Sequence, residues 1–184
     1  MGRYRLVAAD KGSLTVIYGW IRVEPHRERY TCRPVSPLPG RRTWVRKTLQ
    51  QSREGVQRTL VLIDDNEPAT PLGRGVAFDY NPRNRSIEFG YYLPEPNRGR
   101  GLGTHLARLL VDHLFADRVL SLNKVYATTA SNNTPSVRIL EALGFHLEGE
   151  QREHYWVDGT KQSQRIYSFL REEWERMSRA DREK

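Results

Sequence analysis

The sequence predicts a mixed α/β domain of the α+β kind, with one central, mostly antiparallel sheet of about six to seven strands flanked by helices. Three observations lead to this expectation. Strand-like segments follow one another in the middle of the chain, the hydrophobic period then becomes helical, and two more strand-like segments come near the end. The 184 residues are enough for one domain with a buried core.

The first part of the chain combines a strand-like segment, a proline-rich stretch and a helix-like segment. The run LTVIYGWIRV, residues 14–23, is rich in β-branched and aromatic residues and therefore predicts a strand. The prolines between residues 32 and 42 predict an irregular loop. We expect a helix over residues 43–52.

The middle of the chain predicts an antiparallel meander. Residues 58–65, 73–80 and 85–93 each have the composition of a strand. The sequence NPRN, residues 81–84, is a turn signal between the second and third of these segments.

After residue 101 the leucines repeat at helical spacing, which predicts a helix over 102–117. A short strand is expected over 124–130 and a second helix after it. For that helix, Asn133 or Thr134 is the expected N-cap, Pro135 lies in the first turn, and Gly144 is expected to end it in the left-handed conformation.

The end of the chain predicts a strand pair and a helical tail. The two strands are expected near residues 145–155 and 164–170, on either side of a turn at 157–160. The residues from Arg171 onward are highly charged and predict a helix.

Composition excludes several classes of protein. No apolar run approaches the roughly 20 residues of a membrane span, and the N-terminus lacks the apolar region of a signal peptide. Cys32 is the single cysteine, which rules out an internal disulfide and a cysteine-rich metal site. The five histidines have no metal-binding spacing, so no metal is expected. The expected location is cytoplasmic.

The charge balance favours anionic partners. Lys and Arg number 30 and Asp and Glu 22, which gives a net charge of +8. Much of the excess lies between Arg41 and Arg58, either as a solvated helix face or as a docking surface for an acidic or ribosomal partner. Nucleic acid is not the favoured partner, because the aromatic and basic motifs of RNA-binding folds are missing.

The segment between the meander and the first leucine-rich helix has the properties of a phosphate-binding loop. Its glycines allow close approach of backbone N–H groups, the helix start adds partial positive charge, and Arg98 and Arg100 add full charges. A Walker loop would need a lysine, and a dinucleotide fingerprint would need a third glycine at a spacing that is absent. The frame that fits is Arg98-x-x-Gly101-x-Gly103; the alternative is a tight strand–helix connection with a basic rim.

This frame resembles the acyl-CoA-binding signature of the GNAT acetyltransferase superfamily. Asn133-x-x-Ser136, followed by VRILEALGF, is similar to the branch that acetylates ribosomal-protein N-termini and many small amines, and residues 146–170 resemble its closing strand pair. The resemblance covers about residues 60–170. It implies a GNAT fold and a single acetyltransferase domain over 1–184. The expected parts are a divergent acceptor side at 1–57, an acyl-CoA-binding core at 58–170 and a charged tail at 171–184.

The resemblance implies acetyl-CoA as acyl donor, bound without a metal. The loop backbone would hold the pyrophosphate, the end of the preceding strand would pair with the pantetheine amides, and Asn133 would bind pantetheine or cap its helix. The residues expected to bind the donor are Tyr91, Tyr92, Leu93, Arg98, Gly99, Arg100, Gly101, Leu102, Gly103, Thr104 and Asn133.

Two residues are the expected catalytic groups. Glu88 matches the strand position where several GNAT enzymes place a base, and alternation puts it on the face opposite Ile87 and Phe89. It either takes the proton of the amine or only orders water; otherwise it is a solvent-facing glutamate. Ser136 would lie near the thiol and protonate it, or would only make a first-turn backbone bond. Glu153 and Tyr155 are secondary candidates.

The expected reaction is direct transfer of an acetyl group from acetyl-CoA to a primary amine of a small molecule. A protein N-terminus, such as that of a ribosomal protein, is the alternative acceptor. A CoA-binding sensor or docking module without catalysis is the alternative of another class. The sequence leaves open whether the acyl group is longer than acetyl and whether the chain forms a homodimer, and it predicts no membrane partner.

Overall fold

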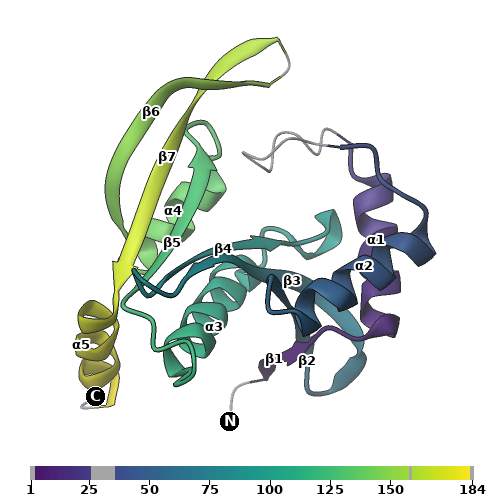
Figure 1. Ribbon diagram of the computed structural model, residues 1–184, viewed down its shortest axis with the longest axis horizontal. Coiled ribbons are helices and arrows are strands. Elements are labelled where there is room, and N and C mark those ends of the chain that lie inside the picture. Colours follow the sequence, from purple (N-terminus) through teal and green to yellow (C-terminus); the bar gives the residue numbers. More distant parts are fainter. Residues whose placement is uncertain (1–2, 26–35, 158, 183–184) are drawn as a thin grey trace.

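The computed structural model describes residues 3–25, 36–157 and 159–182. Within these ranges a seven-stranded sheet has the order β1-β2-β3-β4-β5-β7-β6 (Figure 1). The strands are β1 (Tyr4–Ala8), β2 (Gln57–Asp64), β3 (Glu67–Asn81), β4 (Ser86–Tyr92), β5 (Lys124–Ala130), β6 (His146–Val157) and β7 (Thr160–Leu170). The helices are α1 (Lys11–Val23), α2 (Arg41–Arg53), the short η2 (Glu95–Asn97), α3 (Leu102–Ala116), α4 (Thr134–Ala142) and α5 (Arg171–Arg182).

The sheet is mostly antiparallel, as the sequence predicts. Neighbouring strands pair antiparallel everywhere except between β4 and β5, which run parallel. The parallel pairing consists of three residue pairs, from Ser86 with Lys124 to Glu88 with Tyr126. Beyond Glu88, β4 keeps β3 as its partner and β5 keeps β7, so the sheet divides into two halves at this point.

The expected strand over residues 14–23 is wrong, because this segment belongs to helix α1. Asp10 caps the helix: its carboxylate accepts from the Ser13 amide at 2.7 Å, and the Ser13 hydroxyl accepts from the Asp10 amide. Leu14 and Ile17 are fully buried and lie on one helical face. The capping box and the helical spacing of buried residues outweigh the strand preference of the β-branched residues.

Strand β1 was not predicted. It has five residues and alternates charged and apolar side chains only briefly, so the sequence signal is weak. It forms an antiparallel edge beside β2, with Leu6 opposite Leu62. Strand β3 begins six residues before the expected strand over 73–80, and β7 begins four residues before the expected one over 164–170. The start of the loop expected over residues 32–42 lies outside the described residues; residues 36–40 are irregular, and α2 begins at Arg41. The remaining expected elements are confirmed with small shifts of their ends.

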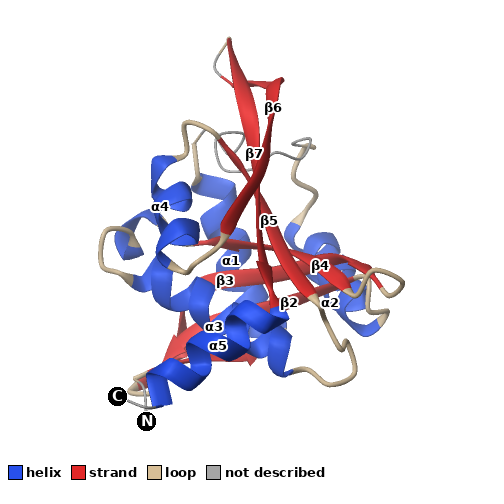
Figure 2. Ribbon diagram, turned by 90° about the vertical axis from the view of Figure 1, so that its left-hand side faces the viewer, coloured by secondary structure: helices blue, strands red, loops and turns tan. Residues whose placement is uncertain are grey.

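Helices lie on both sides of the sheet (Figure 2). Buried apolar residues form a core on each face of the sheet. Successive residues of β2 point to opposite faces, so Val61 and Ile63 pack under α1 and α2. Leu60 and Leu62 point to the other face, where α3 packs. The larger core continues from α3 to α4, β5, β7 and the start of α5. In Figure 1 the β6–β7 hairpin rises at the upper left, and α1 and α2 lie on the right.

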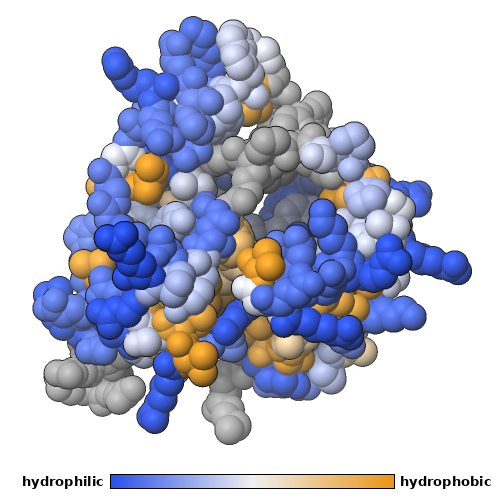
Figure 3. Space-filling model, viewed as in Figure 1, coloured by the Kyte–Doolittle hydropathy of each residue, from blue (hydrophilic) through white to orange (hydrophobic). Residues whose placement is uncertain are grey.

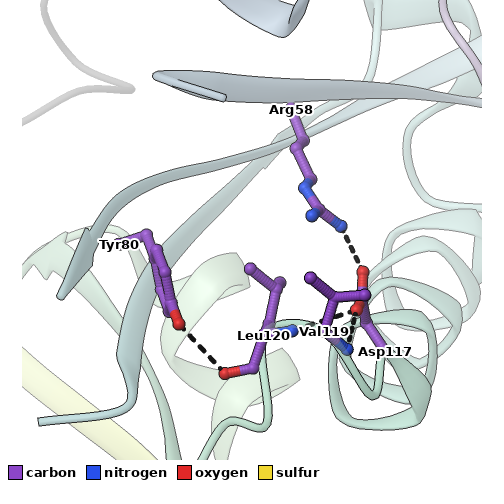
Figure 4. A network of polar contacts seen from close by, with 5 residues as sticks. All are labelled: Arg58, Tyr80, Asp117, Val119 and Leu120. Atoms are coloured by element: carbon purple, nitrogen blue, oxygen red, sulfur yellow. Dashed lines mark hydrogen bonds and ion pairs between the residues drawn. The ribbon is translucent and has the colours of Figure 1, made fainter. Parts of the chain in front are cut away.

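A polar network fixes the segment that follows α3 (Figure 4). The Asp117 carboxylate accepts from the Val119 amide at 2.8 Å and the Leu120 amide at 3.1 Å, and it pairs with Arg58 on β2. The Tyr80 hydroxyl donates to the Leu120 carbonyl at 3.1 Å. Burial acts to raise the pKa of Asp117, but the hydrogen bonds from Arg58 and the two amides leave that pKa below its ordinary value.

No helix within the described ranges is both long enough and apolar enough to span a membrane.

We expect Asp117→Asn to lower the free energy of unfolding by about 1–2 kcal/mol at pH 7, because a charge-assisted bond to Arg58 becomes a neutral one. The folded-state pKa of Asp117 is lowered, so its contribution is present above the unfolded pKa and is lost as the pH falls through the folded value. Urea unfolding at several pH values should therefore show the difference shrinking below about pH 4. Asp65→Asn is the control, because the Asp65–Arg5 pair is exposed. Equal losses in both variants would contradict a special role of Asp117.

Candidate active site

The glycine loop presents bare backbone at the start of α3. Gly99 has φ +72° and Gly101 has φ +76°, and no other atom lies within 4 Å of where a Cβ would stand at either residue. Gly101 is the N-cap of α3, and no side chain caps this helix. The first-turn N–H groups of α3 therefore face outward without intrahelical partners, together with the positive end of the helix dipole. This arrangement suits a phosphate group.

Gly103 has a different role in the same loop. A Cβ at Gly103 would lie 2.9 Å from Cδ1 of Ile139 on α4, which is closer than van der Waals contact allows. The absence of a side chain at Gly103 therefore lets the first turn of α3 pack against α4. The first turn of α3 therefore lies close to the middle of α4.

Arg98 connects the glycine loop to the residue after β4 and to the end of α1. Its Nε donates to the Leu93 carbonyl at 3.0 Å, and its Nη2 donates to the Glu24 carboxylate at 2.8 Å. The Tyr92 hydroxyl donates to the same carboxylate. Burial raises the pKa of Tyr92, and the hydrogen bond to Glu24 and its negative charge raise it further. Glu24 thus joins the end of α1 to the glycine loop, while Arg100 lies exposed on the rim of that loop.

Glu88 lies where the sheet divides and faces a cavity. Its neighbours Ile87 and Phe89 are each 2% exposed in the larger core, so the predicted alternation along β4 is confirmed. The Glu88 carboxylate accepts from the Thr128 hydroxyl at 2.7 Å, a bond that connects β4 to β5 just past their last residue pair. Both residues line a cavity of about 440 Å³ on the face of the sheet opposite α3.

Two hydroxyl groups meet on the α3 and α4 side of the divided sheet. The Tyr91 hydroxyl donates to Oγ of Ser136 at 3.3 Å, which connects the end of β4 to the first turn of α4. Burial raises the pKa of Tyr91 to about 12, although the bond to Ser136 acts in the opposite direction. Asn133 is the N-cap of α4, and its side-chain oxygen accepts from the Ser136 amide at 3.4 Å.

The fold brings most of the predicted site residues to one region. The loop lies at the end of β4, Glu88 lies on one face of β4, and Tyr91 reaches Ser136 on the other. Glu153 and Tyr155 are on the projecting hairpin, where Glu153 pairs with Lys161 at 2.6 Å and takes no part in the cavity. Sequence reasoning missed four side chains of this region, because only the fold reveals what they contact. Glu24 binds Arg98, Thr128 binds Glu88, and the Tyr91 phenol binds Ser136. The fourth is Arg74 on β3, which lines the cavity of Glu88.

The basic segment predicted between residues 41 and 58 is divided between two cavities, since Gln51, Val56 and Gln57 line the cavity of Glu88 whereas most of its arginines do not. Four of its arginines line a second cavity of about 720 Å³ between α1 and α2, together with Lys11. This cavity contains none of the predicted donor-binding or catalytic residues. Figure 3 shows one face of the molecule, which is predominantly hydrophilic with scattered hydrophobic patches.

Comparison with known proteins identifies the family. Residues 4–146 match the acetyltransferase (GNAT) domain family. The chain belongs to the GNAT acetyltransferases. The match begins well before residue 60, so it includes the segment in which the sequence showed no obvious resemblance. GNAT acetyltransferases use acetyl-CoA, which confirms the expected acyl donor at the level of the family.

Several bacterial relatives are similar over parts of their length. The chain is 32% identical to the prophage-derived N-acetyltransferase YokL of Bacillus subtilis over 136 residues, 73% of this chain and 71% of YokL. It is 35% identical to YdaF of the same species, a candidate ribosomal N-acetyltransferase, over 50% of this chain and 49% of YdaF. It is 31% identical to spermidine N(1)-acetyltransferase of Escherichia coli, over 56% of this chain and 53% of that protein. The last two matches span about half of each relative.

Solved structures share the fold at lower identity. The spermidine N-acetyltransferase of Vibrio cholerae, solved in complex with CoA and spermine, superimposes with a TM-score of 0.82. The superposition covers 94% of this chain and 98% of that chain, at 21% identity. A spermidine N-acetyltransferase of the same species, described as dodecameric, has a TM-score of 0.78, 22% identity, and coverage of 94% and 96%. These likenesses confirm the predicted fold.

We expect Gly101→Val to raise the dissociation constant for CoA at least about tenfold, because a β-branched residue strains the left-handed backbone and covers the N–H groups. Isothermal titration with CoA measures this. Gly159→Val is the control, since Gly159 also has a positive φ, at +72°, with no atom within 4 Å of its Cβ position, in the distant hairpin turn. Unchanged affinity in a folded Gly101→Val variant would disprove the phosphate-binding role.

Proposed function

We propose that this chain transfers the acetyl group of acetyl-CoA to a primary amine of a small molecule. The observation that carries the proposal is the position of Glu88. It lies at the point where β4 and β5 separate, with a cavity on one side and the Tyr91–Ser136 hydroxyl pair on the other. The carboxylate on one side of the gap can accept a proton from an amine, and the hydroxyl on the other side can donate one to a departing thiolate.

The residues present fit an acyl-CoA donor. Gly99 and Gly101 leave the α3 N-terminus open to a pyrophosphate, with Arg100 at its rim and Thr104 in the first turn. The β4 edge at Tyr91 and Tyr92 has no strand partner toward β5 within the described chain, so its backbone can pair with amide groups. When bound, acetyl-CoA supplies an activated acyl group as a thioester.

Glu88 acts on the acceptor. A primary amine is mostly protonated near neutral pH and must lose a proton before it attacks a carbonyl carbon. The Glu88 carboxylate takes this proton directly or through one water, and Thr128 holds the carboxylate in place. Ser136 then gives its hydroxyl proton to the departing sulfur. Tyr91, protonated at working pH with a pKa of about 12, returns a proton to Ser136 through their hydrogen bond. Solvent then gives a proton back to Tyr91 and receives the one that Glu88 took from the amine.

We expect Glu88→Gln to lower kcat by about 10²- to 10⁴-fold and to remove the acidic limb of the pH–rate profile, because the amide cannot accept a proton. Steady-state release of free thiol across pH measures both effects. Glu150→Gln, on strand β6 and paired with Arg165, is the matched control and should keep both the rate and the profile. A Glu88→Gln enzyme with an unaltered profile would leave Glu88 only the ordering of water.

We expect Ser136→Ala to slow turnover with little change in the affinity for CoA, and Tyr91→Phe to slow it less. Because the two hydroxyls act through one hydrogen bond, the effects should not add in the double variant. A double-mutant cycle on kcat measures the coupling. Additive effects, or full activity of Ser136→Ala, would reduce Ser136 to part of the α4 cap.

The identity of the acceptor is tested by a screen that follows free thiol. The panel contains small amines, among them the polyamines on which several relatives are named to act, and peptides with ribosomal-type N-termini. Turnover of a small amine supports the proposal. Turnover of peptides alone would favour the protein N-terminus, and CoA binding without any turnover would favour a sensor. We also propose that the enzyme acts in the cytoplasm.

A further inference from the structure

Arg74 lies on the wall of the cavity that contains Glu88. It is on β3, and residues opposite one another on antiparallel strands point to the same face. Three opposed pairs of β3 and β4 residues on this face line the cavity. The opposed pairs are Arg74 with Tyr92, Val76 with Gly90, and Phe78 with Glu88.

The Arg74 guanidinium has no anionic partner within the described chain. Its Nε is completely buried and makes no hydrogen bond to any described residue, while the residue as a whole keeps part of its surface open. The Trp44 ring on α2 lies beside it, with the guanidinium carbon 5.7 Å from the ring centroid. Burial lowers the pKa of Arg74 to about 10. A cation in this setting is destabilised unless a ligand supplies the missing negative charge.

Among the described residues, other partly buried arginines have acceptors within the protein, which makes Arg74 an exception there. Arg58 pairs with Asp117, and Arg98 pairs with Glu24. Arg171 donates to the carbonyls of Leu122 and Phe115 at 2.6 and 3.0 Å. The fold therefore provides acceptors for guanidinium groups that only support structure, whereas the group that faces the cavity lacks one.

We propose that Arg74 binds an anionic group of the acceptor, so that the preferred substrates are primary amines that also carry a carboxylate or a phosphate. This inference rests on the proposed acetyltransferase function and names its substrate class. The planar fork of an arginine matches both anions with paired hydrogen bonds. A polyamine would bring further positive charge beside Arg74, which disfavours it by repulsion.

The register sets the approximate length of such an acceptor. Tyr92, opposite Arg74, lies four residues along β4 from Glu88, so the two positions are about 14 Å apart along the strand at the level of Cα atoms. The side chains shorten this distance from both ends. An acceptor whose amine reaches Glu88 therefore holds its anion several bonds away, as in an ω-amino acid rather than an α-amino acid.

The test compares acceptors that differ only in charge. We would measure kcat/KM for 4-aminobutyrate and 6-aminohexanoate against their carboxamides, for aminoethyl phosphate against ethanolamine, and for spermidine. The expected result is a preference of about 10- to 100-fold for the anionic member of at least one pair, with spermidine below it. This arm uses the unaltered protein, so it does not depend on whether a variant folds.

The second arm uses Arg74→Gln, with Arg74→Lys as the variant that keeps the charge. Arg74→Gln should bring the preference close to one while the affinity for CoA stays unchanged, and Arg74→Lys should keep part of the preference. Arg46→Gln is the matched control, because it removes one charge from the exposed face of α2 outside this cavity and should leave the preference intact.

The outcomes separate the two proposals. Amines that are acetylated without any preference for an anion, or with spermidine preferred, would overturn the role of Arg74 and leave the acetyltransferase function standing. A loss of CoA affinity in Arg74→Gln would also overturn it, by assigning Arg74 to the donor site. Binding of CoA with no turnover of any amine would overturn both.

Discussion

The separation of β4 and β5 after Glu88 is the constraint on which the rest of the site depends. Parallel strands can stay paired only while both backbones run side by side, and here they do so for three residue pairs. Past that point each half of the sheet follows its own neighbours, so backbone groups and side chains at the division are available to ligands. The Glu88–Thr128 hydrogen bond joins the two strands at the start of the gap and gives the carboxylate a fixed place. A continuous sheet would have buried these groups and left no route between its two faces.

The helices cover different faces of the sheet on the two sides of this gap. The smaller core, under α1 and α2, supports the side where Glu88 and Arg74 line a cavity. The larger core places α3 and α4 on the other side, where the glycine loop and Ser136 lie. Glu24 connects the two sides, because it ends α1 and holds both Tyr92 and Arg98. A buried polar contact at the end of α1 thus joins the smaller core to the glycine loop.

Charged groups of opposite sign lie at different positions in this region. Negative charge from Glu88 and positive charge from Arg74 stand at different positions along one cavity wall, while the open N-terminus of α3 and Arg100 lie at the end of β4. A cavity with separated charges of both signs is suited to a molecule that carries an amine and an anion at its two ends. The relatives named for spermidine have the same fold, yet a shared fold does not determine an acceptor. In our proposal the acceptor depends on the few side chains that line the cavity of Glu88.

The sequence by itself determined the order of most elements, the glycine loop and the family, since caps, glycines and hydrophobic periods act over a few neighbouring residues. Residues 98–104 and the Asn133–Ser136 start of α4 could be predicted for this reason.

The sequence led to a wrong prediction where local preference and tertiary packing disagree. In α1 the β-branched residues favour a strand, but the Asp10 cap and the burial of Leu14 and Ile17 stabilise a helix. Only the tertiary structure decided that Arg74 lines the cavity of Glu88 with no hydrogen-bond partner for its Nε among the described residues, that Tyr91 reaches Ser136 and that Glu24 holds Arg98. These contacts join residues 45–74 positions apart or depend on the register of β3 against β4, and no local pattern encodes them.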